Sequence, residues 1–209
     1  MIDLTGQVAL VTGASRGVGK AVALQLAAAG ADIVLNFAKS RSAADDAAGE
    51  IADLGRRVAE VQADVSEPDD VAAMLDWIGE SFGRLDIVVS GVSMTSPQSA
   101  LRSSADVFLT SMTSDARSLL LLAQAARPLL AKSGAGKVIA VSRAASSSTQ
   151  AAVRQLADEL LSDGIQVNAV QAAGDDVAGT VLYLASPLCR GVTGQSLVVA
   201  DAVPLESSL

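Results

Sequence analysis

Glycine residues follow the first apolar stretch of the chain at a spacing that suits phosphate binding. The segment TGASRGVG covers residues 12–19, between the apolar run QVALVT and a stretch of helical periodicity that starts at Gly17. Glycines in such a strand–turn–helix connection permit a tight turn and a close backbone approach to a pyrophosphate, whose charge the helix N-terminus attracts. The spacing G-x-x-x-G-x-G is one residue wider than the standard dinucleotide fingerprint. It predicts a dinucleotide site, the alternative being a turn that is only structural.

Side chains that most often perform acid–base or metal chemistry are scarce in this chain. There is no histidine, which excludes His-containing triads and most zinc sites, and we predict no metal site. Tyr183 is the only tyrosine, Pro187 stands four residues after it, and no lysine follows Lys137. Within the helical pattern VLYLAS we expect Tyr183 to be a packed side chain. The single Cys189 excludes an internal disulfide and favours a reducing compartment and a buried thiol.

The composition describes a chain that folds around small aliphatic residues. Half of its 209 residues are hydrophobic and only 2% are aromatic, and a domain of this length buries roughly 70% of its unfolded surface. The formal net charge is −8 without a Lys/Arg-rich block, so we expect neither nucleic acid nor a membrane as a partner. The first apolar run, Val8 to Val11, is too short for a signal sequence or a membrane span, and we expect a cytoplasmic protein.

Strand and helix patterns alternate along the chain and must position the glycine segment. Apolar, β-branched runs predict strands at residues 7–12, 31–37, 57–65, 85–90, 137–141, 165–170 and 195–200. Helical spacing predicts helices at 17–29, 42–54, 68–82, 119–130 and 150–162, and another that Asp175 and Asp176 open. Parallel neighbours need crossover connections, so we predict an α/β fold: a Rossmann-type doubly wound parallel β-sheet of about seven strands with helices on both faces, in one domain over residues 1–209. The run Ser146 to Ser148 is expected to be a loop.

Together these segments resemble the short-chain dehydrogenases/reductases, most closely the branch like 3-oxoacyl carrier-protein reductase. TGASRGVG is similar to the family's cofactor motif, ADV at residues 63–65 to its adenine segment, and LDIVV, GIQVNAV and DDVAGTVLYLAS to its later strands and C-terminal helix. The resemblance extends over nearly the whole chain. It implies cofactor contacts at Gly13, Ser15, Arg16, Gly17, Val18, Gly19, Asp64, Val65, Ser90 and Gly91.

The resemblance also implies NADP(H) rather than NAD(H), if a nucleotide binds. The second predicted strand has no acid at its carboxyl end, because Asp32 lies at the other end and Asn36 occupies the region that distinguishes the two cofactors. A carboxylate there would bind the ribose 2′-hydroxyl, whereas Arg16, Asn36, Lys39 and Ser40 would accept a 2′-phosphate. Lys39 could equally be a solvated loop charge.

The catalytic residues of the family have no full counterpart here. Its members carry an Asn, a Ser and a Tyr followed four residues later by a Lys, which together polarise and protonate a carbonyl. Alignment along GKVIAVSR puts Arg143 at the Ser position and Ser142 one residue early, on the opposite side of the strand unless the strand is bulged. The Asn position falls near Asp115, and no Tyr-x-x-x-Lys pair exists in the chain. We therefore predict no catalytic residue, only degenerate positions at Asp115, Ser142 and Arg143.

Other segments of the family pattern are altered or missing. Ser93 stands where the family's Asn-Asn-Ala-Gly ends in glycine, so a side chain occupies a place of close backbone approach. The helix before the strand at 165–170 is about one turn shorter than in the family, at the turn that would carry the Tyr and Lys. Only Gln171 to Gly174 follow that strand, where the family inserts a helical lid that excludes water from its substrate.

We therefore predict a catalytically silent, truncated subunit that supports an active NADP(H)-dependent reductase homologue in a hetero-oligomer of acyl-thioester or natural-product metabolism. The resemblance implies a homologous subunit as partner, in a homo- or hetero-oligomer, because family tetramers form through the fourth and fifth helices and the last strand. The run Leu119 to Leu122 covers every side of a helix, so at least one leucine should face outward. One alternative is an active NADP-dependent 3-oxoacyl-thioester ketoreductase with Arg143 or Ser142 as electrophile and water as proton source. The other is an NADP(H)-binding sensor or regulator.

Overall fold

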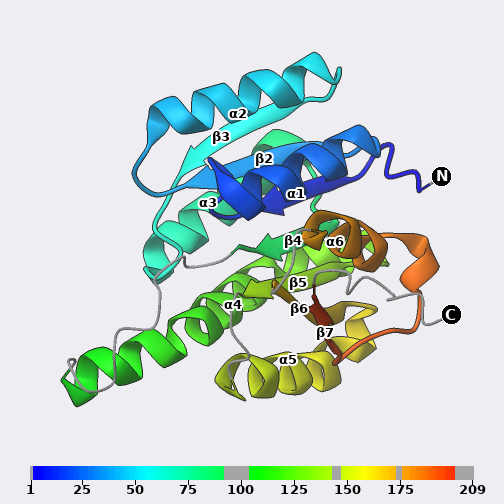
Figure 1. The fold of residues 1–209 in the computed structure, drawn as a ribbon. Coiled ribbons are helices and arrows are strands. Elements are labelled where there is room, and N and C mark those ends of the chain that lie inside the picture. Colours follow the sequence, from blue (N-terminus) through cyan, green and yellow to red (C-terminus); the bar gives the residue numbers. More distant parts are fainter. Residues whose placement is uncertain (1, 92–103, 143–146, 173–175, 201–209) are drawn as a thin grey trace, which may run out of the picture.

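A seven-stranded sheet lies at the centre of the molecule (Figure 1). The computed structural model describes residues 2–91, 104–142, 147–172 and 176–200, with residues 105–112 described by their backbone alone. In spatial order the strands are β3 (Val58–Gln62), β2 (Asp32–Phe37), β1 (Val8–Val11), β4 (Ile87–Ser90), β5 (Lys137–Ser142), β6 (Gln166–Ala172) and β7 (Ser196–Val199). All neighbouring strands are parallel. The predicted Rossmann-type sheet is therefore confirmed.

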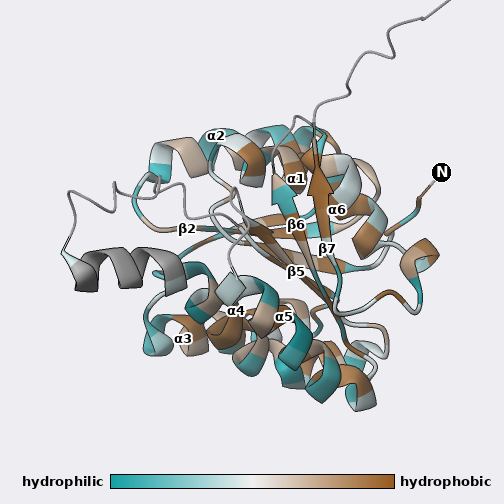
Figure 2. Ribbon diagram, turned by 60° about the horizontal axis from the view of Figure 1, so that its bottom comes forward, coloured by the Kyte–Doolittle hydropathy of each residue, from teal (hydrophilic) through white to brown (hydrophobic). Residues whose placement is uncertain are grey.

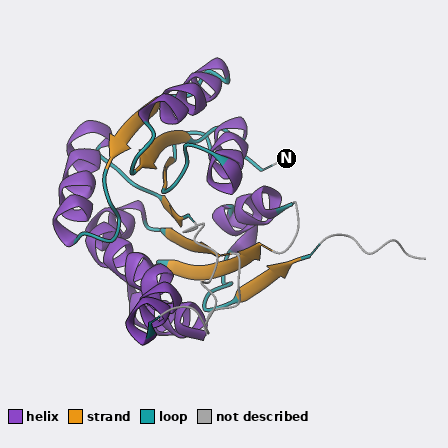
Figure 3. Cartoon of the chain, turned by 60° about the vertical axis from the view of Figure 1, so that its left-hand side comes forward, coloured by secondary structure: helices purple, strands orange, loops and turns teal. Residues whose placement is uncertain are grey.

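Helices cover both faces of this sheet (Figures 1 and 3). One face carries α1 (Gly17–Ala28), α2 (Arg41–Asp53) and α6 (Val177–Ala185). The other carries α3 (Pro68–Phe82), α4 (Ala105–Ser133) and α5 (Ser147–Leu160). Two short 3-10 segments, Leu161–Asp163 and Pro187–Cys189, follow α5 and α6. This arrangement is the one that crossover connections between parallel strands produce.

The core consists of aliphatic side chains in two layers, one on each face of the sheet. Alternate residues of β5 divide between the layers, since Ile139 and Val141 pack with α1 and α6 while Val138 and Ala140 pack with α4 and α5. Figure 2 shows hydrophobic strands between helices that carry hydrophilic residues. Cys189 is buried, as the sequence predicted. Within the described ranges, none of the helices has the length and apolar character needed to cross a membrane.

Helix α3 follows its sequence pattern closely. Its residues Val71, Met74, Leu75 and Ile78 are buried on one side, as a spacing of three and four residues requires. Pro68 occupies the first turn, where its missing N–H costs nothing, and Gly83 ends the helix with φ of 72°. The predicted helix and its start at the Ser66–Pro68 segment are confirmed.

Two helices begin earlier than the sequence predicted. Helix α4 starts at Ala105 rather than at residue 119, because the segment before Leu119 mixes polar and apolar residues without a continuous apolar stripe. Helix α5 starts at Ser147, so the expected loop is wrong for Ser147 and Ser148. Serine is unfavourable inside a helix but suits its first turn, and the run therefore marks a helix start.

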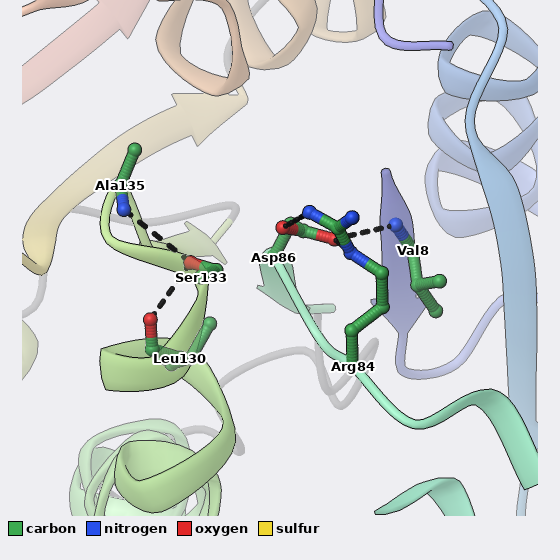
Figure 4. A network of polar contacts seen from close by, with 6 residues as sticks. All are labelled: Val8, Arg84, Asp86, Leu130, Ser133 and Ala135. Atoms are coloured by element: carbon green, nitrogen blue, oxygen red, sulfur yellow. Dashed lines mark hydrogen bonds and ion pairs between the residues drawn. The ribbon is translucent and has the colours of Figure 1, made fainter. Parts of the chain in front are cut away.

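Asp86 fastens the amino ends of β1 and β4 to each other (Figure 4). Its side chain is 7% exposed, and its Oδ2 accepts the backbone N–H of Val8 at 2.8 Å. The guanidinium of Arg84 donates to both carboxylate oxygens, at 2.9 and 2.6 Å. The backbone N–H of Asp86 in turn donates to the carbonyl of Val8 at 2.9 Å. A buried carboxylate with three donors is fully satisfied, which makes it a structural group.

The variant Asp86→Ala should lower the free energy of unfolding by about 1–3 kcal/mol, because it leaves the buried N–H of Val8 without an acceptor. Asp3→Ala is the matched control, since the carboxylate of the exposed Asp3 also accepts a backbone N–H, that of Thr5 at 2.9 Å, and its loss in contact with water should cost less than the loss of Asp86. Urea denaturation of both variants measures the difference. Equal destabilisation by the two variants would contradict the assigned role of Asp86.

Candidate functional site

A cleft opens at the carboxyl ends of the strands, where the strand order changes direction between β1 and β4. Its walls consist of Thr12, Gly13, Asn36, Ala38, Ala63, Asp64, Val65, Ser90, Gly91, Asp115, Ser118, Ala140, Val141, Ser142 and Thr149. The cavity volume is about 140 Å³. In open α/β sheets, ligands bind at this switch point outside the carboxyl ends of the strands. The cleft therefore lies where the glycine segment predicted a ligand.

The phosphate loop combines two turns in the left-handed region with one close backbone approach. Gly13 has φ of 62° and Gly17 has φ of 58°, a conformation that side chains rarely adopt. A Cβ at Gly19 would overlap the carbonyl oxygen of Gly13. Helix α1 starts at Gly17 with no acidic residue in its first turn. Its free N–H groups and positive dipole end are thus not neutralised by an acidic side chain of that turn.

The ends of β1 and β4 approach each other just beside this loop. The N–H of Gly91 donates to the hydroxyl of Thr12 at 2.7 Å. A Cβ at Gly91 would overlap the carbonyl oxygen of Thr12. Only glycine fits this approach, and the floor of the cleft is therefore backbone.

Asp64 and Val65 line the side of the cleft that the family resemblance assigns to adenine. The Oδ1 of Asp64 accepts the backbone N–H of Ser66 at 2.9 Å and its hydroxyl at 2.7 Å. These hydrogen bonds, first that of the Ser66 hydroxyl, hold the pKa of Asp64 below its usual value, and the charge of Lys39 adds to the effect. Asp64 is thus held as an oriented carboxylate.

Asn36 lines the cleft, but its side-chain amide donates hydrogen bonds to the protein backbone. Its Nδ2 donates to the carbonyls of Val61 and Ala63, at 3.3 and 3.0 Å, and the residue is 2% exposed. The two N–H groups of this amide therefore hold the end of β3 against β2. Lys39 and Arg16 are exposed in the two loops that border the cleft. A phosphate at this end would meet those two cations before it met Asn36.

The opposite end of the cleft is polar and comes from α4, α5 and β5. Asp115 and Ser118 lie one turn apart on α4, Thr149 lies in the first turn of α5, and Ser142 ends β5. Strand β5 pairs with β6 in unbroken register to Ser142, which matches Gln171. The strand has no bulge, and yet Ser142 lines the cleft.

Ser142 thus lines the cleft without a bulge, while its part in the catalytic serine role stays a prediction. Ala140, two residues earlier, packs with α4 and α5, and Ser142 faces the same side because strand side chains alternate. The cleft is open on that side, which the strand pattern alone could not show. Arg143, the other degenerate position, lies outside the described residues.

The predicted cofactor residues divide into those that form the cleft and those that border it. Gly13, Asn36, Asp64, Val65, Ser90 and Gly91 are in its walls. Ser15, Arg16, Gly17, Val18, Gly19, Lys39 and Ser40 belong to the adjoining loops and helix start. The sequence interpretation missed Thr12, Ser118 and Thr149. Of these, Ser118 could have been found from its position one helical turn after Asp115.

The tyrosine and the last lysine of the chain lie away from the cleft. Tyr183 is on α6 and is 41% exposed, so the expectation of a packed side chain is wrong. Lys137 begins β5 while Ser142 ends it, which separates the two by roughly 16 Å at the usual rise per strand residue. Neither residue is among those that form the cleft walls. The described cleft thus contains no Tyr–Lys proton relay.

The phosphate loop and the adenine side of the cleft fit a nicotinamide dinucleotide. A Cβ at Gly19 or at Gly91 would collide with neighbouring backbone, so the glycines keep these two places free of side chains. Helix α1 starts in the phosphate loop, at Gly17. The cavity volume lies below the roughly 300–1,000 Å³ of pockets that enclose whole ligands. The described walls would therefore enclose only part of such a cofactor.

Comparisons with known proteins agree with this geometry. A family model described as short chain dehydrogenase matches residues 7–180. A 3-oxoacyl-[acyl-carrier-protein] reductase of Synechocystis is 32% identical over 241 aligned positions, covering 95% of this chain and 97% of that protein. Because the alignment is longer than the 209 residues of this chain, the relative carries segments that have no counterpart here.

Solved structures show the same fold. A short-chain type dehydrogenase/reductase from Mycobacterium marinum superposes with a TM-score of 0.86 at 28% identity, covering 95% of each chain. A short chain dehydrogenase from Burkholderia cenocepacia in complex with NADP gives a TM-score of 0.84 at 28% identity, covering 94% of this chain and 97% of that one. The architecture of this chain is thus that of short-chain dehydrogenases/reductases, one of which was solved in complex with NADP.

The variant Gly19→Ala should lower the free energy of unfolding by about 1–3 kcal/mol, because the new Cβ meets the rigid carbonyl of Gly13. Gly49→Ala, in α2 where a Cβ meets open space, should instead stabilise by about 0.5–1 kcal/mol through helix propensity. Urea denaturation of the pair checks the opposite signs. A Gly19→Ala variant as stable as Gly49→Ala would show that the loop is not packed as described.

Proposed function

The chain belongs to the short-chain dehydrogenase family of oxidoreductases, and from this premise we propose that it is a catalytically silent member that associates with an active NADP(H)-dependent homologue. The homologue would act on a keto substrate, in line with the names of the relatives. The scaffold and the phosphate loop serve assembly and positioning in this proposal, while the partner subunit performs the hydride transfer.

One observation carries the proposal, namely the loss of the proton-transfer pair. The only tyrosine has Pro187 four residues after it, and no lysine follows Lys137. Helix α5, which would carry the pair, begins at Ser147 and supplies Thr149 to the cleft. The buried threonine hydroxyl cannot replace a tyrosine whose pKa a neighbouring lysine lowers. The described cleft is thus formed without the groups that protonate the reacting oxygen.

An exposed groove between α4 and α5 supports the proposed association. Thr113, Ala116, Arg117, Leu120, Gln124, Ala152, Gln155, Leu156 and Glu159 line it. Leu120 is 41% exposed at its centre, so the expectation that one leucine of the run faces outward is confirmed. A single exposed leucine is also normal on a free helix surface, so the support for an interface comes from the groove that α4 and α5 form together. A homologous subunit would cover it with the same two helices.

A second surface at the edge of the sheet could join further subunits. Val198 on the edge strand β7 is 63% exposed, and Leu188 in the segment after α6 is 72% exposed. An edge strand with an exposed apolar residue is a surface that proteins usually cover. We assign this edge to the second contact of a hetero-tetramer.

The position of Ser142 favours one alternative function, an active ketoreductase with a non-standard site. The Ser142 side chain is in the cleft wall with Asp115 and Ser118. Its hydroxyl would donate a hydrogen bond to the carbonyl oxygen of a keto substrate, which would then take its proton from water. A bound NADPH would supply the hydride. An NADP(H)-binding regulator remains the third candidate, because it needs only the phosphate loop.

Purified protein should not oxidise NADPH in the presence of 3-oxoacyl thioesters, because no proton donor of the family type remains. The assay follows NADPH absorbance, and a fluorescence titration of NADPH accompanies it. Turnover that disappears in Ser142→Ala would support the ketoreductase instead. Tight NADPH binding that alters association, without turnover, would support the regulator, whereas absence of binding would eliminate both alternatives and leave the silent subunit.

The variant Leu120→Asp should abolish co-purification with a co-expressed active homologue from a neighbouring gene, because it puts a charge into the groove between α4 and α5. Leu54→Asp is the matched control, since Leu54 is 45% exposed on another part of the surface and should leave the complex intact. Size-exclusion chromatography of the co-expressed pair measures both. A wild-type chain that remains monomeric and alone would contradict the proposal.

A further inference from the structure

A second cavity lies at the amino ends of the strands, opposite the cleft that opens at their carboxyl ends. Gln7, Arg84, Asp86, Ser133, Gly134, Ala135, Lys137, Leu161, Gly164, Ile165, Gln166, Ala185, Pro187, Arg190, Gly191 and Thr193 line it. Its volume is about 380 Å³, within the range of small-molecule pockets. Figure 4 shows part of its wall, with Arg84 on Asp86 and the Ser133 turn opposite. Nothing in the proposed function uses this cavity.

Lys137 is the unusual residue of this cavity. It is 6% exposed, and its Nζ donates to the Oε1 of Gln166. Among the described residues, no carboxylate lies within ion-pair distance of this ammonium. Burial lowers the pKa of Lys137, the nearby Cys189 sulfur partly offsets this effect, and the positive charge of Arg190 adds to it. A buried ammonium normally has an anionic partner.

Asp86 supplies the carboxylate that lines this cavity, and it already has hydrogen-bond partners. Asp86 accepts hydrogen bonds from Val8 and from two nitrogens of Arg84, which leaves the charge of Lys137 uncompensated. The carbonyls at the ends of α4 and α5 have partners of their own, since Leu130 accepts from the Ser133 hydroxyl and Leu160 from the N–H of Ile165. The partial charge of such helix ends favours a cation. That partial charge is smaller than the full negative charge that would neutralise the Lys137 ammonium.

Gln166 holds Lys137 and the Arg190 segment together. Besides accepting from Lys137, its Nε2 donates to the carbonyls of Cys189 and Val192, at 3.1 and 2.8 Å. These carbonyls flank Arg190, whose side chain lines the cavity. A single neutral amide thus positions two cations on one cavity, from segments far apart in the chain.

We propose that this cavity binds a small anion that carries a phosphate group, between Lys137 and Arg190. Three cations and one carboxylate line the cavity, so its side chains leave two positive charges, which match the dianion of a phosphate monoester near neutral pH. The guanidinium of Arg190 suits two phosphate oxygens, and Lys137 contributes a point charge at the base of the cavity. Such an anion would supply the partner that the buried ammonium lacks.

The test measures anion binding by the full chain, with inorganic phosphate and glycerol phosphate as probes against chloride of equal ionic strength. Both probes should raise the unfolding temperature in a saturable way, because they bind only the folded protein. Lys137→Met keeps the buried stem, and Arg190→Gln changes an exposed side chain. Each variant should weaken binding at least about tenfold, the loss of one charge-assisted contact.

Two matched variants separate this cavity from other sites. Arg127→Gln removes an exposed arginine that pairs with Asp163 outside the cavity, and Arg16→Gln removes the cation of the phosphate loop. Arg127→Gln should bind the probes like the wild type, whereas Arg16→Gln should lose only the binding that occurs at the phosphate loop. The proposal is overturned if stabilisation rises without saturation in every variant, as general salt exclusion would produce. It is equally overturned if Arg16→Gln abolishes binding while Lys137→Met and Arg190→Gln retain it.

Discussion

The pairing of β1 with β4 is the contact on which the rest of the structure depends. At their amino ends Asp86 accepts the N–H of Val8, and at their carboxyl ends the Thr12 hydroxyl accepts the N–H of Gly91. Between these two points the strands pair in register through apolar residues that are fully buried. The strand order changes direction here, so the same pair that joins the two halves of the sheet also opens the cleft between them.

The features that stabilise this fold are separate from those that would perform its family's chemistry. Burial in two aliphatic layers and the close approaches of Gly19 and Gly91 involve no catalytic group. A chain can therefore lose a tyrosine, a lysine and a lid without losing its sheet. Most of the stabilisation of such a domain comes from apolar burial. This separation is the physical reason why a reductase fold can persist in a subunit that lacks the catalytic groups.

The amino ends and the carboxyl ends of the strands differ in the charges that surround them. The cleft at the carboxyl ends has the N-terminus of α1 and little fixed charge beyond Asp64 and Asp115. The cavity at the amino ends collects the C-termini of helices together with three cationic side chains. In parallel α/β folds this polarity follows from the crossover direction, because every helix runs antiparallel to its strands. Cations at the amino ends of the strands complement the partial negative charges of the helix C-termini. The full positive charge of Lys137 is larger than those partial charges can balance.

The sequence by itself determined the sheet, most of its helices and the absence of a Tyr-x-x-x-Lys pair. Alternating apolar runs and the spacing of Val71, Met74, Leu75 and Ile78 depend on local periodicity, and the absence of a Tyr–Lys pair needs no structure at all. Only the tertiary structure decided that Ser142 lines the cleft, that the Asn36 amide binds the end of β3, and that Lys137 and Arg190 line one cavity. Those facts depend on which segments lie side by side, and a one-dimensional pattern holds no record of distances between residues far apart in the chain.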